Sequence, residues 1–85
     1  MNEEARFIEA FNEVLAQDPN TPPGPTAINR LLNEKYDRKR ERTPDNTLNG
    51  RMSTLRRRLL REAGFKQEIH INEYGGKSYG RWHRP

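Results

Sequence analysis

The sequence predicts an α+β fold in which a three-helix core is followed by a C-terminal β-hairpin. Three stretches, at residues 3–16, 25–38 and 44–63, space their apolar residues three and four apart, as one buried helix face requires. The last stretch, at residues 67–83, alternates apolar and polar residues ahead of a Gly-Gly pair, which is typical of a hairpin. Because 85 residues can form only one small core, we expect a single domain.

The helix expected at residues 3–16 has the clearest amphipathic pattern. Asn2 can cap its first turn, and Glu3 and Glu4 carry negative charge where the helix dipole favours it. The run QDPNTPPGP then ends the helix, because prolines cannot continue it. The expected buried face comprises Phe7, Ala10, Phe11, Val14 and Leu15.

The helix expected at residues 25–38 begins at Pro25 or Thr26, since both residue types suit a helix start. The charged run DRKRER follows its apolar stripe, and Thr43-Pro44-Asp45 then signals the start of the next helix. The stripe consists of Ala27, Ile28, Leu31, Leu32 and Tyr36.

The helix expected at residues 44–63 ends at Gly64, a common helix terminator. Leu60 lies outside the narrow apolar arc, so we expect the buried face to widen toward the end of the helix. Gly50 is costly inside a helix, and close approach of a ligand to the backbone would explain it. The arc contains Leu48, Met52, Leu55, Leu59 and Ala63.

The hairpin register follows if Gly75 and Gly76 are the two central residues of a tight turn. Ile71 would then face Gly80, and Ile69 would face Trp82, so that both isoleucines and the tryptophan dock on the helices. The other face would carry Tyr79, Arg81, Asn72 and His70.

Composition excludes several classes of protein. A mean hydropathy of −1.23 argues against a membrane-spanning segment, and the first ten residues do not resemble a signal peptide. There is no cysteine, and two histidines are too few for an all-histidine metal site. No GxSxG, HExxH or P-loop motif occurs. We therefore expect a non-enzyme without catalytic residues, cofactor, metal or small-molecule ligand, located in the cytoplasm or nucleoid or acting as an intracellular phage protein.

The net charge of +4 hides a strong asymmetry. Residues 1–37 carry three bases and seven acids, whereas residues 38–85 carry thirteen bases and five acids. A basic second half of this kind favours a polyanionic partner, most often a nucleic acid.

Three helices and a hairpin on one small basic domain resemble the winged helix-turn-helix superfamily, in particular its small bacterial and phage regulators. The resemblance is carried by Pro25-Thr26-Ala27-Ile28 at the start of one helix, by Leu60-Arg61-Glu62-Ala63-Gly64-Phe65 at the end of the next, and by a wing-like hairpin. It implies that the helix at residues 44–63 enters the DNA major groove while the wing contacts the minor groove and the backbone.

The residues available for these contacts fall into three groups. The expected major-groove residues are Asn46, Asn49, Gly50, Ser53, Thr54 and Arg57, since Asn can pair with adenine and Arg with guanine. The expected backbone contacts are Arg38, Lys39, Arg40, Arg42, Arg58 and Arg61. The expected wing contacts are Gly75, Gly76, Lys77, Arg81 and Arg84.

The sequence therefore predicts a protein that binds double-stranded DNA, as a small transcriptional regulator or a recombination accessory factor. Two alternatives stay open, namely a protein-interaction module for an acidic partner and a non-specific architectural protein of a nucleoid or phage. No heptad or spare apolar stripe is present, so we expect a monomer or weak homodimer that can bridge to another protein.

Overall fold

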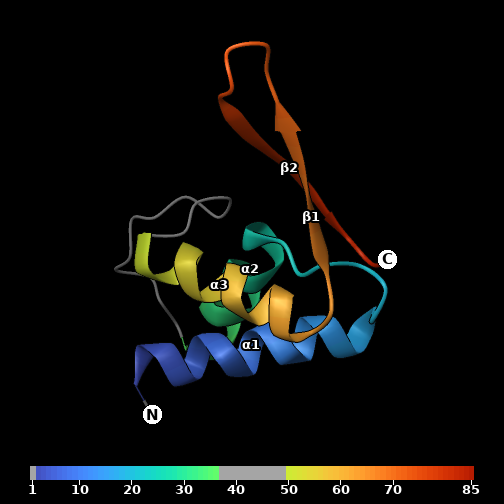
Figure 1. Ribbon diagram of the computed structural model, residues 1–85. Helices are drawn as coiled ribbons and strands as arrows, with labels where there is room; N and C mark the ends of the chain where they lie inside the picture. Colours follow the sequence, from blue (N-terminus) through green and yellow to red (C-terminus); the bar gives the residue numbers. More distant parts are fainter. Residues whose placement is uncertain (1, 37–49) are drawn as a thin grey trace.

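The computed structural model describes residues 2–36 and 50–85. In this part of the chain, three helices precede a two-stranded antiparallel hairpin, which confirms the predicted α+β arrangement (Figure 1). The expected end of the second helix and the start of the third, between residues 37 and 49, lie outside the described residues. The elements are α1 (Glu3–Gln17), α2 (Pro25–Tyr36), α3 (Gly50–Glu62), β1 (Lys66–Ile71) and β2 (Lys77–His83).

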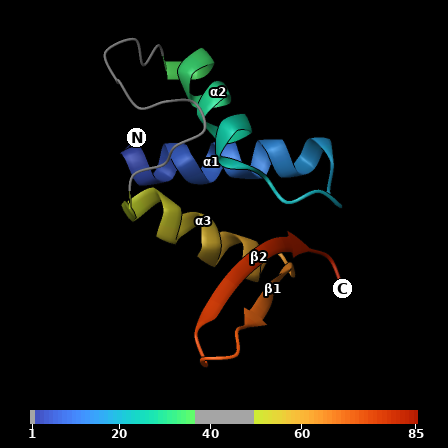
Figure 2. The same cartoon turned by 90° about the horizontal axis from the view of Figure 1, so that it is seen from above.

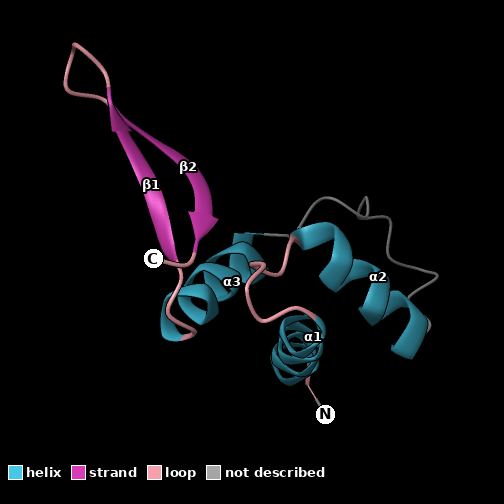
Figure 3. Cartoon of the chain, turned by 90° about the vertical axis from the view of Figure 1, so that its right-hand side faces the viewer, coloured by secondary structure: helices cyan, strands magenta, loops and turns pink. Residues whose placement is uncertain are grey.

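Helix α1 is the centre of the helical body and contacts both α2 and α3, which flank it on opposite sides (Figures 2 and 3). Asn2 caps α1, because its Oδ1 accepts a hydrogen bond of 2.7 Å from the Ala5 backbone amide. Leu60 is fully buried, so the apolar face of α3 widens toward its end as the sequence predicts. The core consists of Phe7, Ala10, Phe11, Ile28, Leu32, Met52, Leu55, Leu59, Leu60 and Phe65.

The buried face of α2 is rotated relative to the predicted stripe. Ala27 is exposed, and Asn29 is buried in its place. The arc that faces α1 runs along Ile28 and Leu32, and residue 29 lies within it while residue 27 lies beyond its edge. Placing Ala27 in the core was therefore wrong.

The C-terminus of α3 is closed by a Schellman motif. The Phe65 amide donates to the Leu60 carbonyl at 3.0 Å, and the Gly64 amide donates to the Arg61 carbonyl at 3.0 Å. Gly64 has a φ of +94°, a conformation that glycine adopts without strain. Burial of Leu60 and Phe65 provides the apolar contact that accompanies this motif, and the chain leaves the helix directly into β1.

The hairpin turn differs from the predicted two-residue turn. The Asn72 amide donates to the Gly76 carbonyl at 2.9 Å, which makes these two residues the closing pair of a three-residue loop, 73–75. The Gly75 amide donates to the Asn72 carbonyl at 3.1 Å, and Gly75 has a φ of +81°, as a type I turn followed by a left-handed glycine requires. Asn72 Oδ1 also accepts from the amides of Tyr74 and Gly76.

This loop changes the register of the whole hairpin. Ile69 pairs with Tyr79 and Ile71 pairs with Lys77, whereas the two-residue turn predicted Trp82 and Gly80 as their partners. A register that differs by an odd number of residues moves side chains to the other face of the ribbon. Tyr79 therefore shares a face with the isoleucines, and its predicted place beside His70 was wrong.

A β-bulge corrects the register near the base of the hairpin. Between the pairs Gln67–Trp82 and Ile69–Tyr79, β2 contains one residue more than β1. The extra residue lies at Gly80 and Arg81, and the Gly80 carbonyl accepts a hydrogen bond of 3.1 Å from the Gln67 side chain. The bulge keeps Trp82 on the face of Gln67, where it packs against the core.

The hairpin projects from the helical body instead of folding onto it (Figures 1 and 3). Ile69 and Ile71 are exposed, so their predicted docking on the helices was wrong. The Cα radius of gyration is 14.1 Å, whereas a compact chain of this length has about 12 Å. Only the base of the hairpin, through Trp82, joins the core.

Candidate nucleic-acid interface

A cleft separates α3 from the hairpin and is lined by basic and neutral side chains. One hollow of about 300 Å³ is lined by Arg57 and Arg61 of α3 and by Gln67 and Tyr79 of the hairpin. A second hollow, of about 410 Å³, shares Gln67 and adds lining residues from the connector before α2, from α3 and from β2. No carboxylate lines either hollow. We call the two hollows together the arginine cleft. The second hollow is lined by Pro22, Arg56, Gln67, Gly80, Arg81 and Trp82.

Arg56 fixes one wall of the arginine cleft. Its Nε donates a hydrogen bond of 2.8 Å to the carbonyl of Pro23, a buried residue of the connector between α1 and α2. Burial, together with the neighbouring charge of Arg57, lowers the pKa of Arg56 from its ordinary value. Arg56 thus holds the connector against α3 and contributes positive charge to the cleft.

Arg57 is held in position by a short chain of hydrogen bonds on the exposed side of α3. Its Nη2 donates to Thr54 Oγ1 at 3.2 Å, and Thr54 Oγ1 donates to the Gly50 carbonyl at 2.9 Å. These three residues, all predicted for the major groove, lie on one stretch of α3. Ser53 is half-buried and is engaged by other groups. Among the described residues, no atom outside the adjoining helix backbone would lie within 4 Å of a Cβ added at Gly50.

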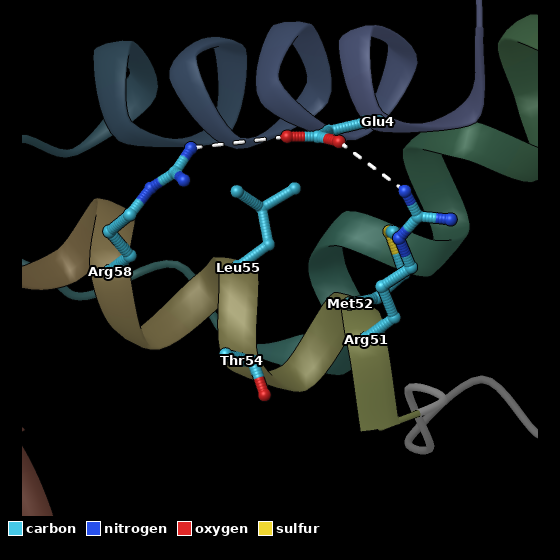
Figure 4. A pocket seen from close by; sticks show the side chains of 6 residues that line it. All are labelled: Glu4, Arg51, Met52, Thr54, Leu55 and Arg58. Atoms are coloured by element: carbon cyan, nitrogen blue, oxygen red, sulfur yellow. Dashed lines mark ion pairs between the residues drawn. The ribbon is translucent and has the colours of Figure 1, made fainter.

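The arginines on the other side of α3 face carboxylates. Glu4 of α1 lies between Arg51 and Arg58, at 3.8 Å from Arg51 Nη2 and 4.0 Å from Arg58 Nη2 (Figure 4). Arg58 Nε also lies 3.6 Å from Glu62 Oε1. Arg58, predicted to contact the DNA backbone, is therefore directed toward α1 and away from the arginine cleft. By contrast, Arg57, Arg61 and Arg81 form no ion pair with any carboxylate of residues 2–36 or 50–85.

Arg84, predicted as a wing contact, is engaged in holding the fold together. Its Nε donates to the Pro19 carbonyl at 2.7 Å, and its Nη1 donates to the Ala63 carbonyl at 2.8 Å. Its guanidinium also lies over the Phe65 ring, 4.3 Å from the ring centroid. One side chain thus joins the α1–α2 connector, the end of α3 and the core, and its donors are not directed toward the hairpin tip.

The remaining wing residues lie at the far end of the hairpin. Lys77 opposes Ile71 on the same face, and Gly75 and Gly76 form the tip. A Cβ at Gly76 would lie 2.8 Å from the Asn72 side-chain amide, so the compact turn itself requires this glycine. Arg81 is separated from these three residues and lines the arginine cleft at the bulge.

Sequence reasoning missed six lining residues of the arginine cleft, namely Pro22, Arg56, Gln67, Tyr79, Gly80 and Trp82. Tyr79 was placed on the opposite face by the wrong register, and Gln67 has no signal beyond its position at the base of the hairpin. Arg56 was assigned to the flank of its helix, and only the fold brings the Pro23 carbonyl to it. The predicted contacts Arg38, Lys39, Arg40, Arg42, Asn46 and Asn49 lie outside the described residues.

Acidic residues gather instead where α1 meets α2. Lys35 forms ion pairs with Glu9, at 3.2 Å, and with Glu13, and the Tyr36 hydroxyl donates to Glu9 Oε1 at 3.2 Å. The hydrogen bonds from Lys35 and then Tyr36 lower the pKa of Glu9, while those to Glu13 and Glu9 raise the pKa of Lys35. Among the described residues, these carboxylates lie where α1 meets α2, and α3 lies on the opposite side of α1 (Figure 2).

Comparisons with protein-family models, with curated proteins and with solved structures find no match for this chain. Within the described residues, no group of three or more acidic, histidine or cysteine side chains is placed to hold a metal ion. No described helix is both long enough and apolar enough to span a membrane. A function for the chain is therefore inferred from its own residues.

Proposed function

We propose that this protein binds double-stranded DNA through α3 and the hairpin, with the exposed side of α3 in the major groove and a phosphate backbone in the arginine cleft. The hairpin would then lie over the adjoining minor groove. A domain of this kind acts by occupying its site, as a transcriptional regulator or a recombination accessory factor does, and it works in the cytoplasm where the nucleoid lies.

The observation that supports this proposal is the pairing state of the arginines. Arg51 and Arg58 are balanced by Glu4 and Glu62, whereas the cleft residues Arg57, Arg61 and Arg81 face no described carboxylate. Unbalanced arginines on two walls of one cleft repel one another, and a linear polyanion placed between them relieves the repulsion. The acidic residues at the α1–α2 contact lie on the side of α1 that is opposite to α3. Their charges would therefore favour an approach of DNA from the side of the cleft.

The side chains within reach suit two different tasks. Thr54 positions Arg57 at the exposed surface of α3, from where a guanidinium can pair with O6 and N7 of a guanine. Arg61 and Arg81 lie on the two walls of the cleft and suit the phosphates of one strand. Base preference therefore depends on Arg57, and general affinity depends on Arg61 and Arg81.

The experiment is a titration of a fluorescent duplex, followed by anisotropy over a series of salt concentrations. Each phosphate contact contributes about 0.9 to the slope of log affinity against log salt. We expect Arg61→Gln and Arg81→Gln each to lower this slope by about 0.9. Arg58→Gln is the matched control on the same helix and should change the slope far less, because Arg58 is already paired with acids.

The outcomes separate the proposal from its rivals. Loss of base preference in Arg57→Ala, measured on selected and random duplexes, supports sequence-specific recognition; equal loss on both would indicate an architectural protein. Absence of binding at low salt, or a slope that is as sensitive to Arg58→Gln as to Arg61→Gln, would contradict the proposed interface. In that case the cleft would remain available to an acidic protein.

A further inference from the structure

The exposed large hydrophobic side chains of the described residues all lie on the hairpin. Ile69 is 56% exposed, Ile71 69% and Tyr79 63%, and the pairing of Ile69 with Tyr79 and of Ile71 with Lys77 places these four side chains on one face. Gln67 and Trp82 continue the same face at the base. We call this surface the inner face of the hairpin: Gln67, Ile69, Ile71, Lys77, Tyr79 and Trp82.

The inner face is continuous with the arginine cleft. Gln67 and Tyr79 line the cleft together with Arg57 and Arg61, so this is the face that the hairpin turns toward α3. Beyond the cleft, the hairpin extends past the helical body (Figure 1), and its inner face continues with Ile69, Ile71 and Lys77. Exposed isoleucines cost free energy in water, and a surface of this kind is typical of a contact that is completed by a partner.

The charges on and beside the inner face indicate which kind of partner can bind to it. It carries Lys77, it adjoins Arg57 and Arg61, and it includes no carboxylate, because Glu68 lies on the other face of β1. A second copy of the chain would bring the same cations against one another. An anionic partner with apolar surface between its charges suits this face, and a DNA minor groove, with phosphates along its rims and deoxyribose walls inside, has that character.

We propose that the inner face enters the minor groove with Ile69 and Ile71 as its apolar contacts, and that it bends the DNA in doing so. This inference rests on the proposed function and adds a deformation of the DNA to it. Lys77 would lie at a phosphate beyond the isoleucines, and Arg61 at a phosphate on the α3 side.

The bend follows from dimensions. The minor groove of B-DNA is about 6 Å wide, whereas two strands lie about 4.8 Å apart before their side chains are added. A two-stranded ribbon that enters face-on therefore fits only if the groove opens. Opening the minor groove around apolar side chains kinks a duplex toward its major groove by about 20–90°, and this bend would wrap the DNA around the tip of α3.

The test measures the affinity and the end-to-end distance of one duplex. Donor and acceptor dyes at the ends of a duplex of about 18 base pairs lie about 61 Å apart when it is straight, and a central kink of about 60° shortens this to about 53 Å. The key variant carries Ile69→Thr and Ile71→Thr together, because threonine keeps the β-branch that strands favour and replaces the ethyl group of isoleucine by a hydroxyl. His70→Thr, on the opposite face of the same strand, is the matched control.

We expect the wild-type chain and His70→Thr to raise energy transfer at saturation. The double variant should bind about tenfold more weakly, because it buries less apolar surface, and should leave energy transfer at the value of free DNA. An unchanged bend in the double variant would overturn the inference while leaving the proposed function intact, whereas failure of the wild-type chain to bind any duplex would remove both. A dimer in sedimentation equilibrium that the double variant abolishes would assign the inner face to a second copy and would also overturn the inference.

Discussion

Replacing Arg84 by alanine is expected to destabilise the whole domain, although this side chain is exposed and belongs to the penultimate residue of the sequence. Arg84 donates to the carbonyls of Pro19 and Ala63 and stacks on Phe65. It thus connects the α1–α2 connector, the end of α3 and the core. Alanine removes all three contacts together.

The expected loss is about 2 kcal/mol of unfolding free energy. Each of the two hydrogen bonds contributes about 0.5–1 kcal/mol at an exposed site, and the contact between the guanidinium and the Phe65 ring contributes about 0.5–1 kcal/mol. For a domain of this size, 1 kcal/mol corresponds to about 4–8 °C in Tm, so Tm should fall by about 8–16 °C.

Thermal unfolding followed by far-UV circular dichroism measures this change. Arg81→Ala, which removes an arginine of β2 that lacks these contacts, is the matched control and should lower the unfolding free energy by less than about 0.5 kcal/mol. Arg84→Lys should lose most of the stability, because an ammonium group cannot reach both carbonyls as the planar guanidinium does. An Arg84→Ala variant as stable as the wild type would refute the assignment of Arg84 to the fold and would return it to the set of possible DNA contacts.

Three further predictions concern other parts of the chain. Glu4→Gln should tighten DNA binding about two- to fivefold, because it releases Arg51 from a weak exposed ion pair and leaves Arg58 paired with Glu62 alone. Glu3→Gln, with the same charge change, should have little effect in the same anisotropy titration. Gly75→Ala should destabilise the hairpin by about 1–2 kcal/mol, since Gly75 has a φ of +81°, and faster exchange of the β1 and β2 amides would report it. The pKa of Glu9 is lowered from its ordinary value of 4.5, so its ionised form should stabilise the fold above that pH, and this stabilisation should be lost as the pH falls through the lowered pKa. Glu9→Gln should flatten this part of the curve of unfolding free energy against pH. An unchanged curve would contradict the role of the Lys35 and Tyr36 contacts.

The helices were predictable because their signals are local. Asn2 caps α1, Pro25 begins α2 and Gly64 follows α3, and each of these residues acts on the turn beside it. The hairpin also has a local signal in its alternating residues, so its existence was predictable. Its register was not, because Gly75-Gly76 fits a two-residue turn, and the Asn72 side chain, by accepting hydrogen bonds from Tyr74 and Gly76, stabilises a three-residue loop instead.

The sequence could indicate which segments contribute to the candidate site, but not which individual residues line it. Charge along the chain predicts that the second half is basic, since this depends only on which segments carry arginine and lysine. The pairing of individual arginines depends on tertiary contacts that are distant in sequence. Arg58 meets Glu4 across the α1–α3 contact, and Arg84 meets the Pro19 carbonyl across 65 positions of the chain. Neither contact can be inferred from the spacing of residues along the sequence.

The central claim, that DNA lies between α3 and the hairpin, is tested most directly by the amide shifts of the isotope-labelled chain during titration with a short duplex. The account predicts that the shifts concentrate on Thr54, Arg57 and Arg61 of α3 and on residues 67–81 of the hairpin. The amides of Glu9, Glu13 and Lys35 at the α1–α2 contact should remain unchanged. Shifts that concentrate on the α1–α2 contact and spare the arginine cleft would contradict the claim.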